Sequence, residues 1–459
     1  MWSWACCVQF SVSEFGWRRP GRPRARRSAC WIVLLACVTA VRLPAEGAAA
    51  VQALQLARAA AGHMEAGEPA AAVEKLQAAS ALRPDFASLA LELATAQAAA
   101  GAADDALRSL EQYAAFGLYA PVERLPAFAP LRARSEFQGL VKRIAANQHA
   151  KGGGEIAFSL RDVTGLIEGI AWREQTGEFL FGDVQARTIW VRAKDGALRR
   201  LLPEAAELWG VFGLAIDETS GTIWAATSAV PEMSGFEPDL AGAAAVAEID
   251  LASGTLRRVI AVPRRPGSDA SHRLTDIALG PDGTVWVADG GMPQLWRLPP
   301  GAAALEALPE SSEYFALQGV AVLPSGTVLV ADQINGLVRV GAARGDARGL
   351  PAPPATTLGD ITSLTLAPDG RVLALQTGVR PNRLLRVELE GDGEAIARVE
   401  VLESGHIAMG APSQGCIGAG GHYHFIGHAG WSRFSAGDGR PSAPRQVPVF
   451  RTTLTPARR

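Results

Sequence analysis

The stretches GTVWVADGG (residues 283–291) and GTVLVADQINGLVRV (residues 326–340) follow one pattern: a glycine, an alternating apolar run and an aspartate. Each begins at the end of a turn signal, PDG in the first case and PSG in the second. Apolar alternation bounded by glycine, proline and aspartate is typical of a short β-strand. A strand that recurs in this way indicates a repeated architecture, so the number of copies decides the fold.

The pattern occurs six times in the second part of the chain, always with another short apolar run ahead of it. Most copies are followed by a third run and several by a fourth. The copies start at Gly177, Gly221, Gly283, Gly326, Gly370 and Gly421. Four short strands per repeat are the signature of a propeller blade. Residues 155–459 are therefore predicted to form an all-β six-bladed β-propeller.

Two further features concern how the blades pack. The apolar run EIAFSLRD (residues 155–162) has no place in the six repeats, and we expect it to close the ring by pairing with the last blade. Each blade must bury both faces against its neighbours, so large aromatic residues are expected between blades. The candidates are Trp172, Trp190, Trp224, Trp286 and Trp296.

Residues 48–146 are rich in alanine, leucine, glutamate and glutamine with helical periodicity, which predicts a short α-helical region. Equivalent residues recur 34 positions apart, a spacing that resembles the tetratricopeptide repeat. The pairs are Gly67 and Gly101, Ala72 and Ala106, and Leu76 and Leu110. We expect the small residues to let paired helices approach closely. So short an array favours a spacer, with a groove for a peptide or protein partner as the alternative. Residues 147–154 are the predicted linker.

The first 47 residues have the order of an export signal. The basic stretch GWRRPGRPRARR precedes the apolar residues 29–41, and small residues follow at 45–49. Thirteen apolar residues are too few to span a bilayer but suit a signal peptide. We therefore expect a periplasmic or secreted protein without a transmembrane span. The alternative is lipid anchoring at Cys37, which ends a lipobox-like LLAC. After removal of the leader only Cys416 remains, so no internal disulfide is expected.

Charge and motifs exclude several functions. Residues 1–45 hold seven arginines and one glutamate, so the remainder has 37 basic and 45 acidic residues and no basic stripe. This argues against nucleic acid as a partner. The chain has no G-x-S-x-G nucleophile, no P-loop, no dinucleotide fingerprint after a strand and no C-x-x-C pair. A covalent hydrolase, a kinase and a hydride-transfer enzyme therefore find no support.

The first strand of each blade begins, and the second ends, on the face that holds the mouth of the central channel, where ligands usually bind. The positions ahead of strand one are Glu168, Phe212, Thr275, Gln318, Thr362 and Gln414. The ends of strand two are Asp183, Ser228, Asp289, Asp332, Thr377 and His428. Because the aspartate of the VAD motif recurs, a turn role is favoured for Asp183 and Asp332. The role of Asp289 is left open.

The repeat resembles the NHL-repeat and the regucalcin/gluconolactonase-like propellers. That resemblance implies a divalent cation such as calcium, held by a glutamate of an E-G-P-x-W opening, two asparagines and an aspartate. Here EGIAW supplies Glu168 as the implied metal ligand. The other three ligand positions are occupied by Thr275, Gln318 and Thr362. Calcium takes about six to eight oxygens, several of them charged, so we expect weak binding and a degenerate catalytic site.

Histidines and one insertion complete the candidates. His422 and His424 have zinc-like spacing but no evident third ligand. We place His272, His406 and His428 near the mouth, where an imidazole would suit a general base; exposed loop positions are the alternative. Blade two carries a long loop at residues 228–244. Its Met233, Phe236 and Glu237 are expected either to cover the channel or to decorate the surface.

Two functions are compatible with this pattern. The first is an exported binding or scaffold protein whose channel mouth holds a small molecule or peptide. The second is a metal-dependent lactone or ester hydrolase, in which a cation on Glu168 polarises the carbonyl and a nearby His or Asp activates water. The number of oxygen ligands around Glu168 discriminates between them. Replacement of three of the four implied ligands favours binding.

The leader generates a first prediction. The mature chain should begin near residues 45–49, because the basic and apolar segments ahead have the order of a cleaved signal. Intact-mass measurement of protein from the cell envelope fraction tests this. A mass that still includes the first thirty residues would contradict it.

Overall fold

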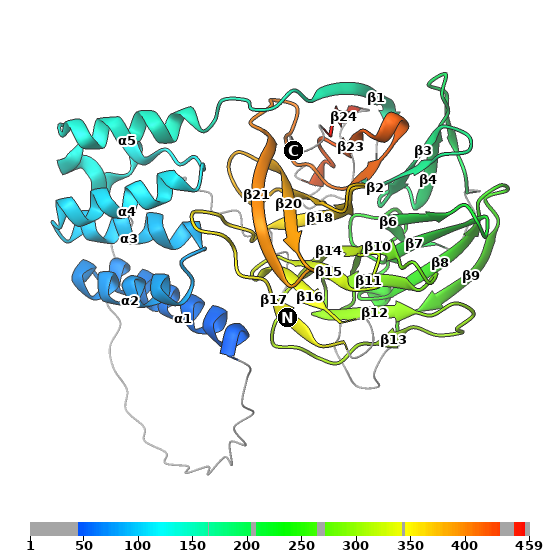
Figure 1. Cartoon of the computed structure of the whole chain (residues 1–459), viewed down its shortest axis with the longest axis horizontal. Coiled ribbons are helices and arrows are strands. Elements are labelled where there is room, and N and C mark those ends of the chain that lie inside the picture. The colour runs from blue at the N-terminus through cyan, green and yellow to red at the C-terminus, as the bar shows by residue number, and fades with distance from the viewer. Residues whose placement is uncertain are drawn as a thin grey trace, which may run out of the picture. The chain divides into compact units, whose positions relative to one another are not determined.

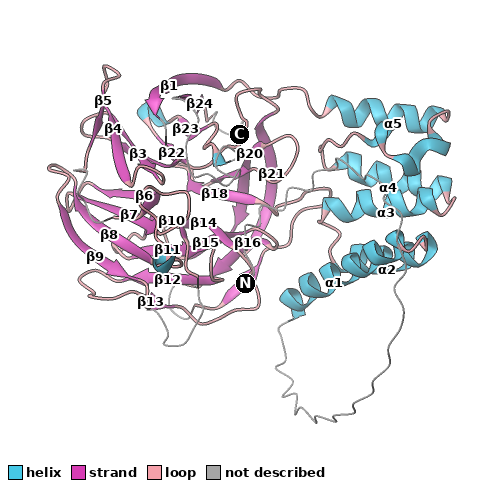
Figure 2. Ribbon diagram, turned by 180° about the vertical axis from the view of Figure 1, so that it is seen from behind, coloured by secondary structure: helices cyan, strands magenta, loops and turns pink. Residues whose placement is uncertain are grey.

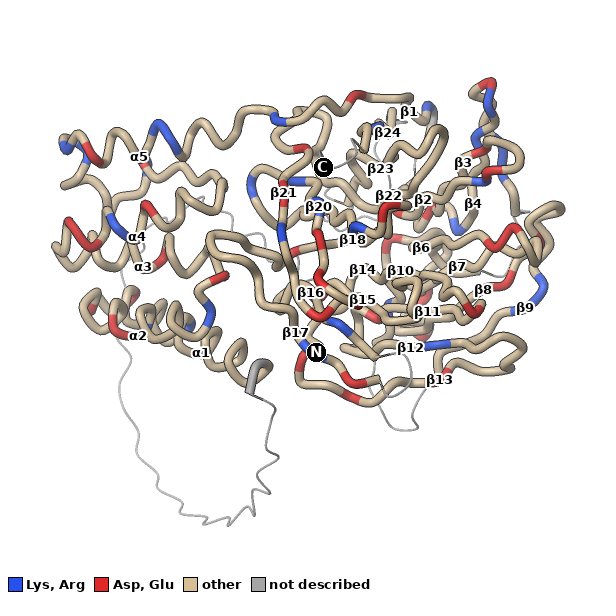
Figure 3. Tube along the Cα trace, in the orientation of Figure 1, with Lys and Arg blue, Asp and Glu red and all other residues tan. Residues whose placement is uncertain are grey.

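The computed structural model describes residues 45–163, 165–202, 208–263, 271–341, 345–431 and 445–454. The predicted leader lies outside these residues apart from its last three positions. Within them, no helix is long and apolar enough to cross a membrane. Figure 3 shows acidic and basic residues interspersed over the helices and the blades.

The first described part is a set of helix pairs (Figure 1). Its elements are α1 (Ala45–Glu65), α2 (Pro69–Leu82), α3 (Ala87–Ala99), α4 (Ala103–Ala115), the 3-10 turns η1 (Val122–Arg124) and η2 (Pro126–Leu131), and α5 (Ser135–Ala146). The 34-residue repeat corresponds to the pairs α1–α2 and α3–α4. Gly67 and Gly101 have φ of 75° and 80°, in the turn inside each pair. The expectation that these glycines lie where helices pack is therefore wrong; they permit left-handed turns.

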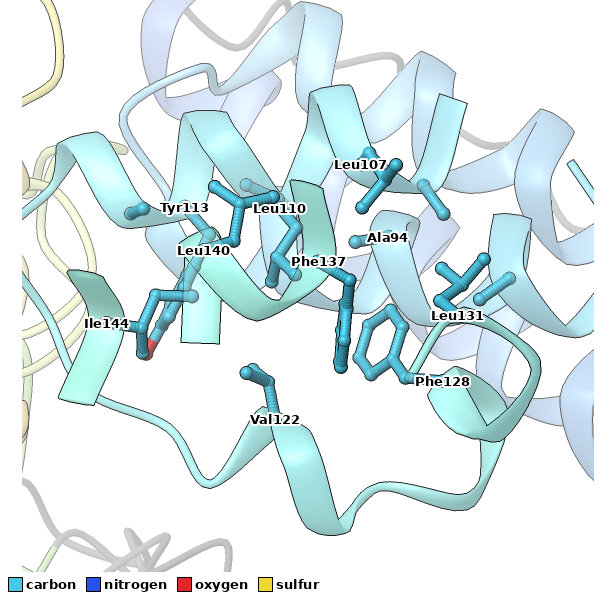
Figure 4. Packing of buried hydrophobic residues seen from close by; sticks show 14 of the residues in the cluster. Ala94, Leu107, Leu110, Tyr113, Val122, Phe128, Leu131, Phe137, Leu140 and Ile144 are labelled. Carbon is cyan, nitrogen blue, oxygen red and sulfur yellow. The ribbon is translucent and has the colours of Figure 1, made fainter. Parts of the chain in front are cut away.

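Alanine and leucine at equivalent places form the core of the helices. Ala72 and Ala106 are both fully buried, as is Leu110, so small side chains let paired helices approach. Beyond the second pair, Phe128 and Phe137 have ring centroids 5.5 Å apart and close the end of the core (Figure 4). The trailing segment thus covers an apolar surface that two repeats leave open.

The second part is a ring of six four-stranded antiparallel sheets, as the repeats predict. Blade one contains β2 (Ile167–Arg173), β3 (Glu178–Asp183), β4 (Thr188–Arg192) and β5 (Leu198–Arg200). Blade two contains β6 (Gly210–Asp217), β7 (Thr222–Ser228), β8 (Ala244–Asp250) and β9 (Leu256–Ala261), with the 3-10 turn η3 (Pro238–Leu240) before β8. Blade three contains β10 (Leu274–Leu279), β11 (Val285–Asp289), β12 (Gln294–Leu298) and β13 (Glu306–Ala307).

Blade four contains β14 (Leu317–Val322), β15 (Val328–Asp332), β16 (Gly336–Val340) and β17 (Ala347–Gly349). Blade five contains β18 (Ile361–Leu366), β19 (Val372–Gln376), β20 (Arg383–Glu390) and β21 (Ala395–Ser404). Blade six contains β22 (Gly415–Ile417), β23 (Tyr423–Ile426), β24 (Arg445–Thr452) and β1 (Glu155–Val163), with the 3-10 turn η4 (Ala419–Gly421) before β23. The six copies of the sequence pattern supply the second strand of every blade.

The ring closes as expected. Strand β1 pairs antiparallel with β24 at the outer edge of blade six, with Leu160 opposite Val447 (Figure 2). The first propeller strand is thereby hydrogen-bonded to the last, which ties the two ends of the ring together. Among the tryptophans, Trp286 and Trp296 are buried between blades, and Trp172, Trp190 and Trp224 are partly buried against apolar neighbours.

The aspartates that end strand two hold turns within their own blades. Asp332 accepts backbone N–H bonds from Phe315 and Ala316 through Oδ2 (2.7 and 2.8 Å), and from Ile334 and Asn335 through Oδ1 (2.9 and 2.8 Å). Asp183 accepts from the Ala186 N–H and the Trp190 indole. The turn role is therefore confirmed for both carboxylates.

In blade five the pattern predicts Thr377 at this place, which is wrong. Strand β19 ends one residue earlier, at Gln376, which pairs with Ile361. The Gln376 side chain takes over the turn role: its Nε2 donates to the carbonyls of Thr357 (3.1 Å) and Gly359 (2.6 Å).

The helices are hydrogen-bonded to the propeller, and the described residues from 45 onward belong to one compact unit. The Arg83 guanidinium donates to the Asn335 side chain (2.8 Å), and the Tyr119 N–H donates to the Arg380 carbonyl (2.7 Å). Arg383 also reaches the helical part. The boundary at residues 147–154 therefore separates two folds but not two independent bodies.

The turn aspartates generate the second prediction. Asp332→Ala should lower the free energy of unfolding by about 3 kcal/mol, because four backbone N–H groups lose their acceptor. Urea unfolding measures this. Asp239→Ala, at an exposed position in η3, is the matched control and should change stability by less than about 0.5 kcal/mol. Equal effects of the two substitutions would contradict the turn role.

The junction generates the third prediction. The fragment 152–459 should unfold cooperatively on its own, since the ring closes within it, but at a lower temperature than the chain from residue 45. The reason is the loss of the hydrogen bonds from the helices to blades four and five. Calorimetry of the two proteins tests this. Absence of a cooperative transition in the fragment would show that the helices belong to the same folding unit.

Candidate functional site

The six inner strands β2, β6, β10, β14, β18 and β22 surround the central channel, each beside the inner strands of neighbouring blades. Five of them have a register shift at the same place, just after their first residues. The residues at the shift are Glu168, Phe212, Thr275, Gln318 and Thr362. The structure thus brings the predicted residues to equivalent positions, with Gln414 directly ahead of β22.

The next residue along each inner strand forms a second ring of small residues. Its members are Gly169, Gly213, Asp276, Gly319, Ser363 and Gly415. A Cβ atom at Gly169 would lie 2.5 Å from the Phe212 carbonyl oxygen, and one at Gly319 would lie 2.7 Å from the Leu364 nitrogen. Contacts of that length are too close for a side chain, so these two strands require glycine here.

Asp276 is the one carboxylate in this second ring. Its Oδ1 accepts the Ile277 N–H (2.9 Å), and its Oδ2 accepts the N–H of Val320 in the next blade (3.1 Å). The side chain passes beside Gly319, which has none of its own. A signal was available in the sequence: the inner strands read EG, FG, TD, QG, TS and QG, so Asp276 stands where four blades have glycine.

Glu168 is held from one side only. Its Oε1 accepts the indole N–H of Trp431 (3.1 Å), and Trp431 stacks on Phe212 with ring centroids 5.9 Å apart. The Ser413 hydroxyl donates to the Glu168 carbonyl oxygen (3.0 Å). The second carboxyl oxygen, Oε2, is buried and has no hydrogen-bond partner among the described residues. An acceptor in that state is costly unless a ligand or water supplies a donor.

Both channel carboxyls are less acidic than usual. Burial raises the pKa of Glu168 to about 7, opposed by the Trp431 indole, the Ser413 hydroxyl and the positive charge of Arg273. Burial also raises the pKa of Asp276 to about 7, and the nearby Glu168 raises it further against two backbone N–H bonds. Like charges disfavour joint ionisation, so the pair is poised to hold at least one proton near neutral pH.

Three other residues of the ring hydrogen-bond to backbone carbonyls. The Thr275 hydroxyl donates to the carbonyls of Ala288 (3.2 Å) and Leu317 (3.1 Å). Gln414 Nε2 donates to the Thr275 carbonyl (2.9 Å), from blade six to blade three. Thr362 donates within its own blade (3.3 Å to the Leu375 carbonyl). Gln318 is partly buried beside Gly290. Glu168 Oε2 is thus the buried acceptor of this ring that has no hydrogen-bond partner among the described residues.

Asp289 belongs to the turn of blade three. Its Oδ2 lies 2.7 Å from His272 Nδ1 and 3.3 Å from the Trp296 indole nitrogen. Its Oδ1 accepts backbone N–H bonds from Arg273, Gly291 and Met292 (each 3.0 Å). The carboxylate is fully buried by these contacts, so its geometry matches that of the other turn aspartates.

The remaining histidines lie in blade six. His424 is buried against Phe179, with ring centroids 4.9 Å apart, and its Nδ1 lies 3.2 Å from the His422 carbonyl oxygen. His406 packs edge-on against Phe450. The prediction that His428 ends strand two of blade six is wrong, because β23 ends at Ile426. His428 lies two residues further on, is partly buried and forms an isolated bridge with Ala411.

The long loop of blade two contributes to the rim. Met233 is buried and Phe236 partly buried in an apolar cluster that also holds Phe212 and Trp431. The Ser234 N–H donates to the Gln185 carbonyl of blade one (2.9 Å). Glu237 is exposed. The loop therefore supports the aromatic residues that hold Glu168.

The donor set does not fit the calcium site that the family resemblance implies. No group of three or more His, Cys, Asp or Glu side chains with metal-binding geometry occurs over the described ranges. Both Asp276 oxygens already accept backbone N–H bonds, and the Thr275 hydroxyl faces two backbone carbonyls. Glu168 alone falls well short of the six to eight oxygens that calcium takes.

No family model matches the sequence, and no curated protein matches it. Solved propellers do. A putative glucose dehydrogenase from Thermus thermophilus is 18% identical, covering 65% of this chain and 99% of its own, with a TM-score of 0.45. A gluconolactonase from Xanthomonas campestris is 17% identical, covering 63% and 88%, with a TM-score of 0.42. Virginiamycin B lyase from Staphylococcus aureus is 17% identical, covering 60% and 82%, with a TM-score of 0.40. Likeness at this level carries no inference about activity.

The raised pKa of Glu168 generates the fourth prediction. A carboxyl with a pKa of 4.5 when unfolded and about 7 when folded costs the folded state nothing below pH 4.5. Between pH 4.5 and 7 its ionisation in the unfolded state increasingly destabilises the folded state, and above pH 7 the loss of folding free energy levels off at roughly 3 kcal/mol. Glu168→Gln should therefore gain stability relative to the wild type as pH rises from 4.5 to 7.

Urea unfolding across that window measures the difference between the wild type and the variant at each pH. Glu237→Gln, at an exposed position of the blade-two loop, is the matched control and should follow the wild type. A difference between wild type and Glu168→Gln that does not change with pH would contradict the assignment.

Proposed function

We propose that this protein is an exported β-propeller binding protein whose channel mouth takes a small polar molecule or the end of a peptide. One observation carries the proposal: Glu168 Oε2 is buried without a donor in the described part of the chain, while Oε1 is fixed by Trp431. A ligand hydroxyl or N–H in the mouth would complete the hydrogen bonds of this carboxyl. Because the carboxyl is already held in place, ligand binding does not have to order the Glu168 side chain, and this lowers the entropic cost of binding.

The surroundings define the ligand chemistry. Phe212 and Trp431 provide an apolar wall beside Glu168, and Asp276 lies in the ring below. With a pKa near 7, Glu168 is present both as an acceptor and as an acid that can donate its proton. A neutral molecule that combines hydroxyls with an apolar face suits this mouth better than a small anion. The helical repeats would serve as a spacer or as a surface for a protein partner.

A metal-dependent lactone or ester hydrolase is the competing function. It requires a cation that polarises the carbonyl, and the oxygen donors around Glu168 are too few to hold one tightly. No distance or contact in the mouth favours it over binding. The hydrolase is therefore treated as the alternative that the experiment below can establish in place of binding.

The fifth prediction tests this proposal by thermal shift and calorimetry with monosaccharides, polyols and free amino acids as probes. At least one neutral polar probe should stabilise the wild type in a saturable way. Glu168→Gln should weaken that binding about tenfold or more, the value of a hydrogen bond to a charged group. Glu237→Gln should bind as the wild type does.

Titration with calcium, zinc and manganese, and a glucono-lactone hydrolysis assay, accompany these measurements. We expect weak cation binding and no efficient turnover. Tight stoichiometric cation binding, with turnover abolished in Glu168→Gln, would replace the binding proposal with the hydrolase.

A further inference from the structure

A cavity of about 220 Å³ lies where blade five meets the helices, away from the channel mouth. Cationic and hydroxyl groups provide most of its polar lining. The lining includes Phe116, Lys151, Thr356, Thr357, Arg383 and Ser404. Neither Glu168 nor any other ring residue of the mouth contributes to it.

Arg383, the first residue of β20, is the buried cation of this cavity, with 5% of its surface exposed. Its Nε and Nη2 donate to Gln376 Oε1 (3.0 and 2.6 Å), and its Nη1 donates to the Phe116 carbonyl oxygen (3.0 Å). Gln376 is itself fixed by two backbone carbonyls. The guanidinium is thus held rigidly by three bonds, and all of its acceptors are neutral.

No carboxylate of the described residues lies within ion-pair distance of Arg383. The next arginine along the same strand differs: Arg386 pairs with Glu400 at 2.5 Å. The nearby buried acid Glu403 accepts the Thr452 hydroxyl instead (3.2 Å). Removing a charge from water costs several kcal/mol, which a partner of opposite charge offsets only when its geometry is good and further hydrogen bonds are made.

The C-terminal end of α4 offsets only part of the free energy lost by burying the Arg383 guanidinium. Phe116 is the C-cap of α4, so its carbonyl is one of the free acceptors at the negative end of the helix. A cation there gains at most about 2 kcal/mol. The guanidinium has five N–H groups, and three bonds leave two of them without a named acceptor. A second cation, Lys151, lines the same space.

We propose that this cavity binds a small oxyanion, a phosphate or a carboxylate, which pairs with the remaining N–H groups of Arg383. The Thr357 and Ser404 hydroxyls are suitable secondary donors, and Lys151 adds a second positive charge. Because Arg383 joins the end of α4 to blade five, the bound anion strengthens the attachment of the helices to the propeller. This proposal does not depend on the channel site.

Calorimetry and thermal unfolding with sodium phosphate, sodium sulfate and sodium succinate test it, against sodium chloride at matched ionic strength. The relative response to phosphate and succinate distinguishes the two kinds of anion. We expect saturable binding and a raised melting temperature in the wild type. Arg383→Gln should reduce the affinity at least tenfold, and Lys151→Ala by a few fold. Arg386→Gln is the matched control, since its charge is already paired, and should bind as the wild type does.

The proposal is overturned if the oxyanions act no more strongly than chloride, or if Arg383→Gln responds as the wild type does. If Arg383→Gln fails to fold, the proposal is tested instead with crystals of the wild-type chain grown in the presence of selenate. An anomalous selenium peak within hydrogen-bond distance of Arg383 supports the site, and its absence under saturating selenate rejects it.

Discussion

The close approach of the inner strands at the ring of small residues is the constraint on which the rest of this propeller depends. At Gly169, Gly213 and Gly319 a side chain would collide with the backbone of the neighbouring blade. At Gly415 the space is taken by the Tyr423 hydroxyl. Six blades can therefore surround a narrow channel only if this layer lacks large side chains. The ring above it then forms a mouth, and Asp276 is conspicuous as the carboxylate in the layer.

The same residue type has opposite roles in two places. Asp183, Asp289 and Asp332 are buried but saturated by donors from their own blades, so they stabilise the turns that end strand two. Glu168 and Asp276 lie in the channel, and burial raises the pKa of both, as it does for Asp183 and Asp332; of these carboxyls, Glu168 alone has a buried oxygen without a donor among the described residues. Burial therefore does not distinguish the two groups of acids, and the unpartnered Oε2 sets Glu168 apart from the turn aspartates.

At the junction with the helices the buried charged group is a cation, Arg383, whose hydrogen-bond partners are all neutral. Gln376 occupies the place that aspartate has in three other blades, and its neutral side chain leaves Arg383 without a counter-charge. The guanidinium is bonded instead to the end of α4. A single change of residue type at the end of strand two thus gives blade five a cationic cavity and a connection to the helical repeats.

The sequence by itself determined the architecture, because each blade carries its own copy of a local pattern. Strand periodicity and turn residues repeat six times, so the number of blades and the closing strand predicted at residues 155–162 follow without long-range information. The six residues of the first ring, from Glu168 to Gln414, could also be predicted, because each occupies the same position ahead of strand one in its copy of the repeat. The helix pairs were predictable from their 34-residue spacing, although Gly67 and Gly101 were assigned to packing when their backbone serves the turns.

Only the tertiary structure decided which of the ring residues remain available to a ligand. Three ring residues donate hydrogen bonds to backbone carbonyls of their own blade or of a distant one: Thr275, Thr362 and Gln414. The position of a residue within the repeat does not predict such bonds. Trp431 reaches Glu168 from 263 positions away. The cavity at Arg383 joins segments 267 residues apart. A repeat fixes position within a blade, whereas burial and hydrogen-bond saturation depend on how separate blades and helices meet.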